Sequence, residues 1–336
     1  MLKSILYNKN DQTPIYKQIA GSIAKQIEKG TLKKDFVLPS INIFSDTYEV
    51  ARDAVEKAYN ELEKDGYIGS ASGKGYYVIG KQQTGLKILC VFNKLSSFKK
   101  IIYYSFIKAL GINVTVDLHI HHYNPQHLKR IIDDNLGKYD QYVIIPHFEA
   151  NMNPKVYMDI IKEIPPDELL LLDRTIPGFS NCKSVYQDFR GDIFDALVKA
   201  TDLLQKYHTL TIIFPQHSHH PAGIIAGLED FCSQYDKRFT VIFNEDEIRL
   251  AKRIVYIVIA DDDLAVLVKK VRRSAFVTGK DIGIISFNES ELKELLDITV
   301  ISTDFKKMGE TAAELILQNK VEQIKNPFVM IKRGSL

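Results

Sequence analysis

The clearest periodic segment of the chain is VARDAVEKAYNELEKDGYI, at positions 50–68. Val55, Ala58, Tyr59 and Leu62 follow the i, i+3, i+4, i+7 spacing, which predicts a helix with one apolar face. Gly66 marks the predicted end of this helix. Charged and amide side chains fill the opposite side, so the helix is expected to present a polar face to its surroundings.

Two shorter helices are predicted before this segment and a hairpin after it. Thr13-Pro14 and Leu38-Pro39-Ser40 have the composition of helix starts, with Ser40 as the expected N-cap of the second helix. Short β-prone runs at 67–68 and 76–79 flank the glycine-rich turn GSASGKG. Three helices followed by a hairpin predict a winged helix-turn-helix domain over residues 1–79.

The pattern changes after GKQQTG, a polar segment at residues 80–85 that we interpret as a linker. From residue 86 to residue 336, β-branched runs alternate with amphipathic segments, including one predicted helix over 191–207. The runs are LKILCVF, VTVDLHI, YVIIP, LLLLD, LTIIFP, FTVIFN, IVYIVIA and IGIISF. This alternation predicts an α/β fold with two lobes of doubly wound parallel sheet, whose ligands bind beyond the carboxyl ends of the strands.

Composition and charge limit the class of protein and the cellular compartment that the sequence fits. The formal net charge of +2 excludes a polybasic chain, and residues 1–80 hold eleven basic against ten acidic side chains, a net of +1. The three cysteines, Cys90, Cys182 and Cys232, are scattered among apolar or small neighbours, which predicts free thiols in a reducing compartment. No signal peptide or membrane-spanning run is apparent. We therefore expect a cytoplasmic protein with no membrane partner.

The helix-turn-helix pattern predicts where double-stranded DNA would be contacted. A recognition helix meets base edges in the major groove with its first residues, and an arginine there suits guanine. The predicted contacts lie at the starts of two helices and at the hairpin tip: Ser40, Asn42, Arg52, Asp53, Gly73, Lys74 and Gly75. Lys74 would enter the minor groove, and the two glycines would let the backbone turn around it.

Residues 11–79 resemble the winged-helix domain of the GntR family of bacterial transcription regulators. The resemblance rests on PIYKQIAGSIAKQIEKG, LPS, VARDAVEKAYNELEKDGYI and GKGYYV together. Two departures affect the expected DNA contacts. Ser40-Ile41-Asn42 replaces the usual Ser-Glu-Arg, and Ala51 replaces the usual serine before the recognition arginine.

Most of residues 86–336 resembles the two-lobed LacI/ribose-binding-protein family, through LLLLDRTIPG, IADDDLAVLV, IGIISFN and TVISTDFKKMGETAAELIL. This resemblance implies a periplasmic-binding-protein-like domain that binds a sugar between its lobes. It implies a stacking role for Phe98, and hydroxyl contacts from Asp173 and Arg174 on one lobe and from Asp261 and Asn288 on the other. Thr303 would lie where the chain crosses the cleft.

Two positions depart from this second family. The loop PQHSHHPAG stands where an arginine is usual, and we expect His219 or His220 to take its place. Asn288 replaces an aspartate that is usual there, which lowers the negative charge of the predicted site.

Each assignment has a structural alternative. Phe98 could be core, Asp173–Arg174 a structural ion pair, and Asp262 or Asp263 the cap of the next helix. HIHHYNPQH and HSHH suggest a metal, but they lack a matched ligand spacing, so no metal or other cofactor is expected. No P-loop or GxSxG supports an enzyme. A protein-interaction or enzymatic α/β domain without sugar sensing is the alternative function.

The two resemblances together imply a sugar-responsive, DNA-binding transcription regulator that is not an enzyme. Regulators of arabinose and fucose operons share this hybrid plan. The expectation is a homodimeric repressor of a carbohydrate-utilisation operon, released by a monosaccharide. The size of the implied polar ring favours a pentose or a 6-deoxyhexose such as L-fucose.

Overall fold

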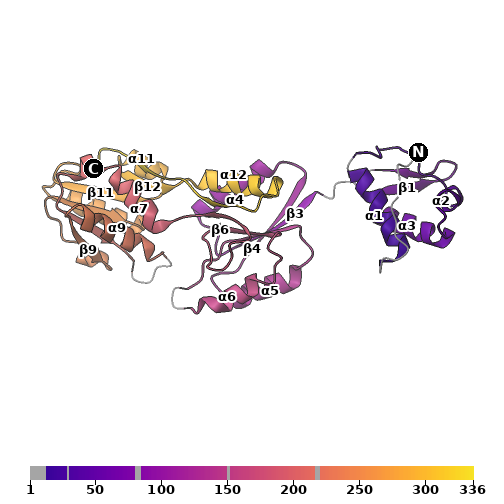
Figure 1. Cartoon of the computed structure of the whole chain (residues 1–336). Helices are drawn as coiled ribbons and strands as arrows, with labels where there is room; N and C mark the ends of the chain where they lie inside the picture. Colours follow the sequence, from indigo (N-terminus) through magenta and orange to yellow (C-terminus); the bar gives the residue numbers. More distant parts are fainter. Residues whose placement is uncertain (1–12, 29, 80–84, 150–151, 216–219) are drawn as a thin grey trace. The chain divides into compact units, whose positions relative to one another are not determined.

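A computed structural model describes residues 13–28, 30–79, 85–149, 152–215 and 220–336. The chain divides into two compact units, Met1–Leu86 and Lys87–Leu336 (Figure 1). Each unit has buried hydrophobic clusters of its own. Of the predicted linker over 80–85, residues 80–84 lie outside the described part of the chain.

The first unit contains three helices and a two-stranded hairpin. Its elements are α1 (Ile15–Glu28), α2 (Ile41–Tyr48), α3 (Arg52–Lys64), β1 (Ile68–Ala71) and β2 (Gly75–Val78). The strands pair antiparallel, with Ile68 opposite Val78. The predicted apolar face of α3 is buried, and its Tyr59 hydroxyl donates to the Pro39 carbonyl oxygen at 2.9 Å. The order of elements is that of a winged helix-turn-helix, as predicted.

The second unit contains two six-stranded sheets in its described residues, with strand orders β13-β7-β6-β5-β3-β4 and β14-β12-β11-β10-β8-β9. We call the first sheet and its helices lobe 1, and the second lobe 2. The lobe 1 strands are β3 (Leu86–Phe92), β4 (Val114–Ile120), β5 (Gln141–Ile144), β6 (Leu169–Asp173), β7 (Lys183–Tyr186) and β13 (Gln323–Lys325). The lobe 2 strands are β8 (Thr209–Ile213), β9 (Arg238–Ile242), β10 (Ile254–Val258), β11 (Ile282–Phe287), β12 (Thr299–Thr303) and β14 (Phe328–Ile331).

Neighbouring strands run parallel through the middle of both sheets, whereas β14 is antiparallel to β12. Helices α4 (Ser97–Leu110), α5 (Pro125–Asn135) and α6 (Pro154–Ile161) follow lobe 1 strands. Lobe 2 carries α7 (Phe189–Val198), α8 (Thr201–Leu204), α9 (Gly223–Gln234), the 3-10 turn Glu245–Glu247, α10 (Asp261–Arg272) and α11 (Glu291–Leu295). The predicted two-lobed α/β architecture is confirmed.

The last long helix, α12 (Phe305–Leu317), follows a lobe 2 strand but packs on lobe 1, against α4, β6 and β7 (Figure 1). Gly309 makes this approach possible. A Cβ atom there would collide with the Ile102 carbonyl oxygen and would lie 2.9 Å from the Phe106 nitrogen. The chain passes between the lobes after β7, after β12 and between β13 and β14, so three described segments join the lobes.

Several short elements depart from the sequence prediction. The predicted helix over 191–207 is divided into α7 and α8, because the Thr201 hydroxyl donates to the Val198 carbonyl oxygen at 2.7 Å and competes with helix continuation. Strands β7, β13 and β14 and helix α11 were not predicted. No helix within the described ranges is long and apolar enough to cross a bilayer. Cys90, Cys182 and Cys232 are buried free thiols, as predicted.

Candidate functional site

The start of α3 forms an exposed polar surface on the first unit. Arg52 is its first residue and is exposed, and it forms no ion pair with any residue the structure describes. Asp53 is also exposed and lies 3.6 Å from Lys57 one turn later. Ala51 provides no side-chain cap, so the first backbone N–H groups of α3 stay open to an external acceptor.

The second predicted DNA contact lies at the start of α2. The Ser40 hydroxyl accepts a hydrogen bond from the Ile43 nitrogen at 3.3 Å, which confirms its predicted N-cap position. Asn42, in the first turn of α2, is exposed. Ser40 is therefore occupied in capping, whereas Asn42 is exposed and better placed to meet a phosphate or a base.

The hairpin tip carries the third predicted contact. Gly73 and Gly75 have φ angles of 80° and 76°, values that favour glycine and explain both residues. Lys74 between them is exposed, with Nζ 4.4 Å from the centre of the Tyr77 ring and 3.9 Å from an Asp35 oxygen. Both contacts are at the surface, so they hold Lys74 only weakly.

The second unit contains a cavity of about 440 Å³ between its lobes. It opens where strands end, as expected for doubly wound sheets: Asn93 follows β3, Asp173 ends β6 and Thr303 ends β12. The lobe 1 side, with the start of α12, contributes Asn93, Lys94, Ser96, Phe98, Lys99, Tyr123, His147, Asp173 and Phe305. The lobe 2 side, with the preceding crossover, contributes Gln187, Phe189, His220, Pro221, Ile224, Ile259, Ala260, Asp261, Phe287, Asn288, Thr303 and Phe328.

Most of the predicted effector residues meet at this cavity. Those that line it are Phe98, Asp173, His220, Asp261, Asn288 and Thr303. Arg174 is not among the residues that line the cavity, and its guanidinium carbon lies 5.7 Å from the Phe189 ring centre. Phe189 itself lines the cavity. His219 lies outside the described residues.

Two aromatic rings form one wall of the cavity. Phe98 in the first turn of α4 stacks on Phe305 at the start of α12, with centroids 4.9 Å apart and planes inclined by 22°. Phe98 is half-buried rather than fully enclosed. The packing of α12 on α4 therefore places an aromatic surface beside the polar groups at the strand ends.

Asp173 is the centre of a buried polar network. Its Oδ2 lies 2.5 Å from Lys99 Nζ and 3.0 Å from His147 Nε2, and its Oδ1 accepts a hydrogen bond from the Gln187 amide. Gln187 in turn accepts a hydrogen bond from the Thr303 hydroxyl. The network therefore runs from α4 and β6 of lobe 1, through the segment after β7, to β12 of lobe 2.

The charge states of this network follow from burial and pairing. Burial alone would raise the pKa of Asp173, but Lys99 and His147 hold it well below its usual range. Burial lowers the pKa of His147 to about 3, and burial also lowers the pKa of Lys99. At neutral pH His147 is therefore uncharged.

The lobe 2 carboxylate, Asp261, is oriented by a buried lysine. Asp261 begins α10, so neither Asp262 nor Asp263 caps this helix as predicted; the N-cap position is Ala260, without a side-chain cap. Asp261 Oδ1 lies 2.8 Å from Lys293 Nζ, although the Asp261 side chain is 69% exposed. One carboxylate oxygen is thus held while the side chain remains accessible.

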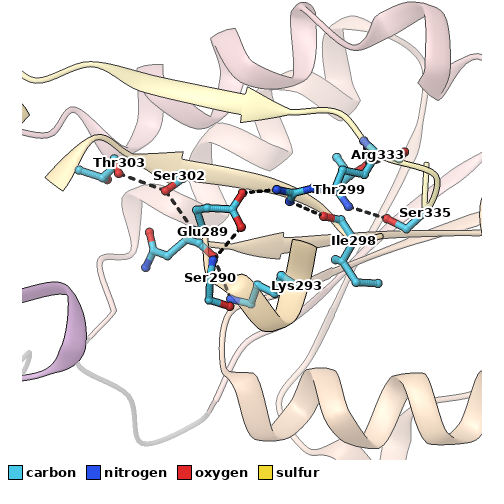
Figure 2. Close-up of polar contacts among 10 residues, drawn as sticks. Glu289, Ser290, Lys293, Ile298, Thr299, Ser302, Thr303, Arg333 and Ser335 are labelled. Atoms are coloured by element: carbon cyan, nitrogen blue, oxygen red, sulfur yellow. Dashed lines mark hydrogen bonds and ion pairs between the residues drawn. The ribbon is translucent and has the colours of Figure 1, made fainter. Parts of the chain in front are cut away.

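The loop after β11 is fixed in an unusual conformation. Asn288 has φ of 63°, a value that asparagine tolerates better than most residues. Its nitrogen donates to the Ile301 carbonyl oxygen at 2.8 Å, and its own carbonyl oxygen accepts from Lys293 Nζ at 2.9 Å. The next residue, Glu289, donates from its backbone nitrogen to the Ser302 hydroxyl, and its carboxylate pairs with Arg333 at 2.7 Å; both contacts are drawn in Figure 2.

Sequence reasoning missed several cavity residues, of which the clearest are Lys99, His147, Gln187 and Phe305. His147 follows the predicted strand YVIIP, so the strand-end rule could have found it. Lys99 is adjacent to Phe98 but had no separate signal. Gln187 follows a strand that was not predicted. Within the described ranges, no three His, Cys, Asp or Glu side chains are grouped to hold a metal.

Comparison with known proteins links the first unit to one family. Residues 15–78 match the family described as bacterial regulatory proteins, gntR family. The HTH-type transcriptional repressor YtrA of Bacillus subtilis (strain 168) is 35% identical over 74 residues, which are 22% of this chain and 57% of YtrA. The aligned part thus spans less than two thirds of that relative.

Solved structures resemble the larger unit. The trehalose repressor from Escherichia coli has a TM-score of 0.59 at 14% identity, covering 74% of this chain and 100% of that one. A periplasmic binding protein/LacI transcriptional regulator from Alkaliphilus metalliredigens QYMF, complexed with D-xylulofuranose, has a TM-score of 0.56 at 14% identity, covering 74% and 98%. At this identity the shared property is the fold. The resemblance of the first unit is confirmed, and so is the fold that the second resemblance implied. The names of these relatives describe regulators rather than enzymes.

Proposed function

We propose that this chain, which joins a GntR-type helix-turn-helix domain to an effector domain with a LacI-like fold, is a sugar-responsive transcription regulator. In this proposal the first unit binds operator DNA, and a monosaccharide binds between the lobes of the second. The default output is repression of a carbohydrate-utilisation operon in the cytoplasm, relieved by the sugar.

The DNA part of the proposal rests on the exposed start of α3. Arg52 is exposed at the first helical position, where a recognition helix meets base edges. Asn42 and Lys74 would contact the backbone or the minor groove nearby. The weak net charge of the first unit means that one copy has a modest electrostatic attraction for DNA. A homodimer on a two-fold operator would double these contacts.

The sugar part rests on one observation: the Phe98–Phe305 stack lies in the same cavity as the Asp173 network. A sugar ring has an apolar face and several hydroxyl groups, so it needs an aromatic surface beside groups that donate and accept hydrogen bonds. The volume of about 440 Å³ lies within the usual range of small-molecule sites. The D-xylulofuranose complex of a protein with the same fold supports this ligand class.

The lobe 1 and lobe 2 sides of the cavity differ in polarity, which limits the class of sugar expected to bind. Lobe 1 presents most of the charged groups beside its aromatic rings, whereas lobe 2 presents mainly apolar side chains, among them Ile224, Ile259 and Phe287. A ligand with one apolar edge matches this asymmetry better than a sugar with hydroxyls on every side. The asymmetry supports a pentose or a 6-deoxyhexose such as L-fucose.

Lobe closure would couple the sugar to DNA. The link from Asp173 through Gln187 to Thr303 spans both lobes, so a sugar hydroxyl that replaces one of these hydrogen bonds changes the contact between lobes. Linkage requires the converse, namely that operator binding changes sugar affinity by the same factor.

Calorimetry on the full chain with a monosaccharide panel tests this function. We expect one pentose or 6-deoxyhexose to bind, and Phe98→Ala to weaken its binding. Tyr104→Ala, which removes a 65% exposed aromatic ring outside the cavity, serves as the matched control and should leave affinity unchanged. Absence of binding by every sugar in the panel would contradict the proposal.

A further inference from the structure

The tight turn between β4 and α5 holds two bulky residues in the left-handed backbone region. His122 and Tyr123 have φ angles of 51° and 60°. The Asn124 nitrogen closes the turn by donating to the His121 carbonyl oxygen at 2.9 Å. A turn with positive φ at both central residues strongly favours asparagine, aspartate and glycine. Histidine tolerates this region better than most residues, but a tyrosine there is strained. Tyr123 is therefore held in a backbone conformation that its residue type disfavours.

The residues on either side of Tyr123 fix the turn in this conformation. His121 is fully buried, and its nitrogen donates to the Phe92 carbonyl oxygen at 2.9 Å. The His121 Nε2 lies 3.1 Å from the carbonyl oxygen of Ile145, which follows β5. On the other side, Asn124 Oδ1 caps α5 by accepting hydrogen bonds from two of its first backbone N–H groups. Contacts with two neighbouring strands and one helix thus determine where the Tyr123 side chain is presented.

Tyr123 is presented to the effector cavity. It is half-buried, and it lines the cavity from the turn at the carboxyl end of β4. A structural turn would be served as well by asparagine, which suits a φ of 60°. Tyrosine adds a ring and a hydroxyl group that can both donate and accept a hydrogen bond. Backbone strain kept at the wall of a cavity points to a function for the side chain.

The neighbouring strand end carries a polar atom that lacks a partner. Asn93 directly follows β3, lines the same cavity and is 1% exposed. Its Oδ1 is buried and forms no hydrogen bond with any residue that the structure describes. The bond between His121 and Phe92 joins the turn of Tyr123 to the residue before Asn93. Because a buried acceptor without a partner is costly, a ligand hydroxyl at this edge of the cavity is favoured.

We propose that Tyr123 contacts the effector directly, and that its hydroxyl forms a hydrogen bond with one ligand hydroxyl at the β3–β4 edge of the cavity. The inference rests on the proposed function, because it requires a sugar between the lobes, and it adds a residue that selects among sugars. A site built to hydrogen-bond a ligand hydroxyl rejects the analogue that lacks it. The strained turn keeps the Tyr123 side chain at this edge.

Calorimetry of the full chain with L-arabinose, D-xylose, D-ribose and L-fucose tests the contact. For a sugar that binds the wild type, Tyr123→Phe should weaken binding about 2- to 12-fold, the loss expected for one neutral hydrogen bond. Tyr104→Phe is the matched control, because Tyr104 is 65% exposed and is not among the residues that line the cavity. It should leave affinity unchanged.

Deoxy analogues of the bound sugar identify the partner of the Tyr123 hydroxyl. One analogue should bind the wild type and Tyr123→Phe with equal affinity, because the hydrogen bond is absent from both complexes. Every other analogue should still lose affinity when the tyrosine is replaced. A loss of the same size for all analogues, or a Tyr123→Phe variant that binds the parent sugar as tightly as the wild type, would overturn the contact while leaving the sugar-responsive function standing.

Tyr123→Asn separates a ligand contact from a structural role. Asparagine accepts the left-handed backbone, so Tm without sugar should be at least that of the wild type. Sugar affinity should nevertheless fall at least as much as in Tyr123→Phe. A lower Tm together with weaker binding would assign Tyr123 a packing role and overturn the proposal. If none of the four sugars binds the wild type, the proposed ligand class fails together with this contact.

Discussion

Lys99→Met should destabilise the effector domain strongly, because it leaves the Asp173 carboxylate buried without its nearest cation. Lys99 and Asp173 side chains are 9% and 3% exposed, and their charged atoms are 2.5 Å apart. Breaking a buried pair on one side costs about 3–5 kcal/mol. Asp173 keeps the Gln187 amide as a donor and has the His147 ring 3.0 Å away, so we expect the lower end of that range. A loss of about 3 kcal/mol corresponds to roughly 6–12 °C in Tm for a domain of this size.

Differential scanning calorimetry of the full chain measures this shift. Lys100→Met is the matched control, since Lys100 is the next residue of α4 and is exposed. It should change Tm little. The double variant Lys99→Met with Asp173→Asn should recover most of the loss, because both charges are then absent. Asparagine suits this position, where φ is 75°.

The pH dependence gives a second signature of the same pair. Without Lys99 the folded-state pKa of Asp173 rises above its unfolded value, so the variant binds a proton more readily when folded. The difference in Tm between variant and wild type should therefore shrink as pH falls from 7 to 5. A Lys99→Met variant that melts like Lys100→Met would refute the assigned role of this pair.

Three further predictions concern other residues. Arg52→Ala should weaken operator binding in a gel shift by about 5- to 150-fold, the loss of roughly 1–3 kcal/mol expected for one base contact, whereas exposed Lys64→Ala at the far end of α3 should have little effect. Burial lowers the pKa of His147 to about 3 and that of His121 to about 4, so the unfolded state takes up more protons below about pH 6.5 and stability must fall there. Each histidine should lower the free energy of unfolding by roughly 2 kcal/mol between pH 7 and pH 5, as measured by denaturant titration. His147→Gln should remove about half of this combined fall. Lys293→Met should weaken sugar binding in calorimetry, because Asp261 loses the partner that orients it; equal affinity would show that Asp261 needs no such support.

The sequence predicted the fold class well because its signals were local. The helical spacing of Val55, Ala58, Tyr59 and Leu62 and the apolar run LLLLD both describe burial directly, and the structure buries these residues. Elements with mixed composition were missed. Strand β7 contains Lys183, whose buried Nζ is bonded to Gln141 across the sheet, a partner that no local pattern reveals.

The cavity was predicted mainly where the resemblance to a two-lobed family supplied residues. Asp173 and Asn288 end or follow predicted apolar runs, and the second family resemblance selected them together with Thr303. Gln187 and Phe305 reach the cavity because the chain crosses between lobes, and crossings depend on tertiary topology. Helix α11 shows the limit most clearly, since its leucines and Lys293 face the opposite way from what amphipathic periodicity predicts.

The account depends most on coupling between the sugar cavity and DNA. Operator affinity of the full chain, measured by gel shift with and without the sugar identified by calorimetry, tests that coupling directly. We expect the sugar to weaken operator binding by about 5- to 150-fold, the usual range of allosteric coupling, and the operator to weaken sugar binding by the same factor. Operator affinity that is the same with and without saturating sugar would contradict the account.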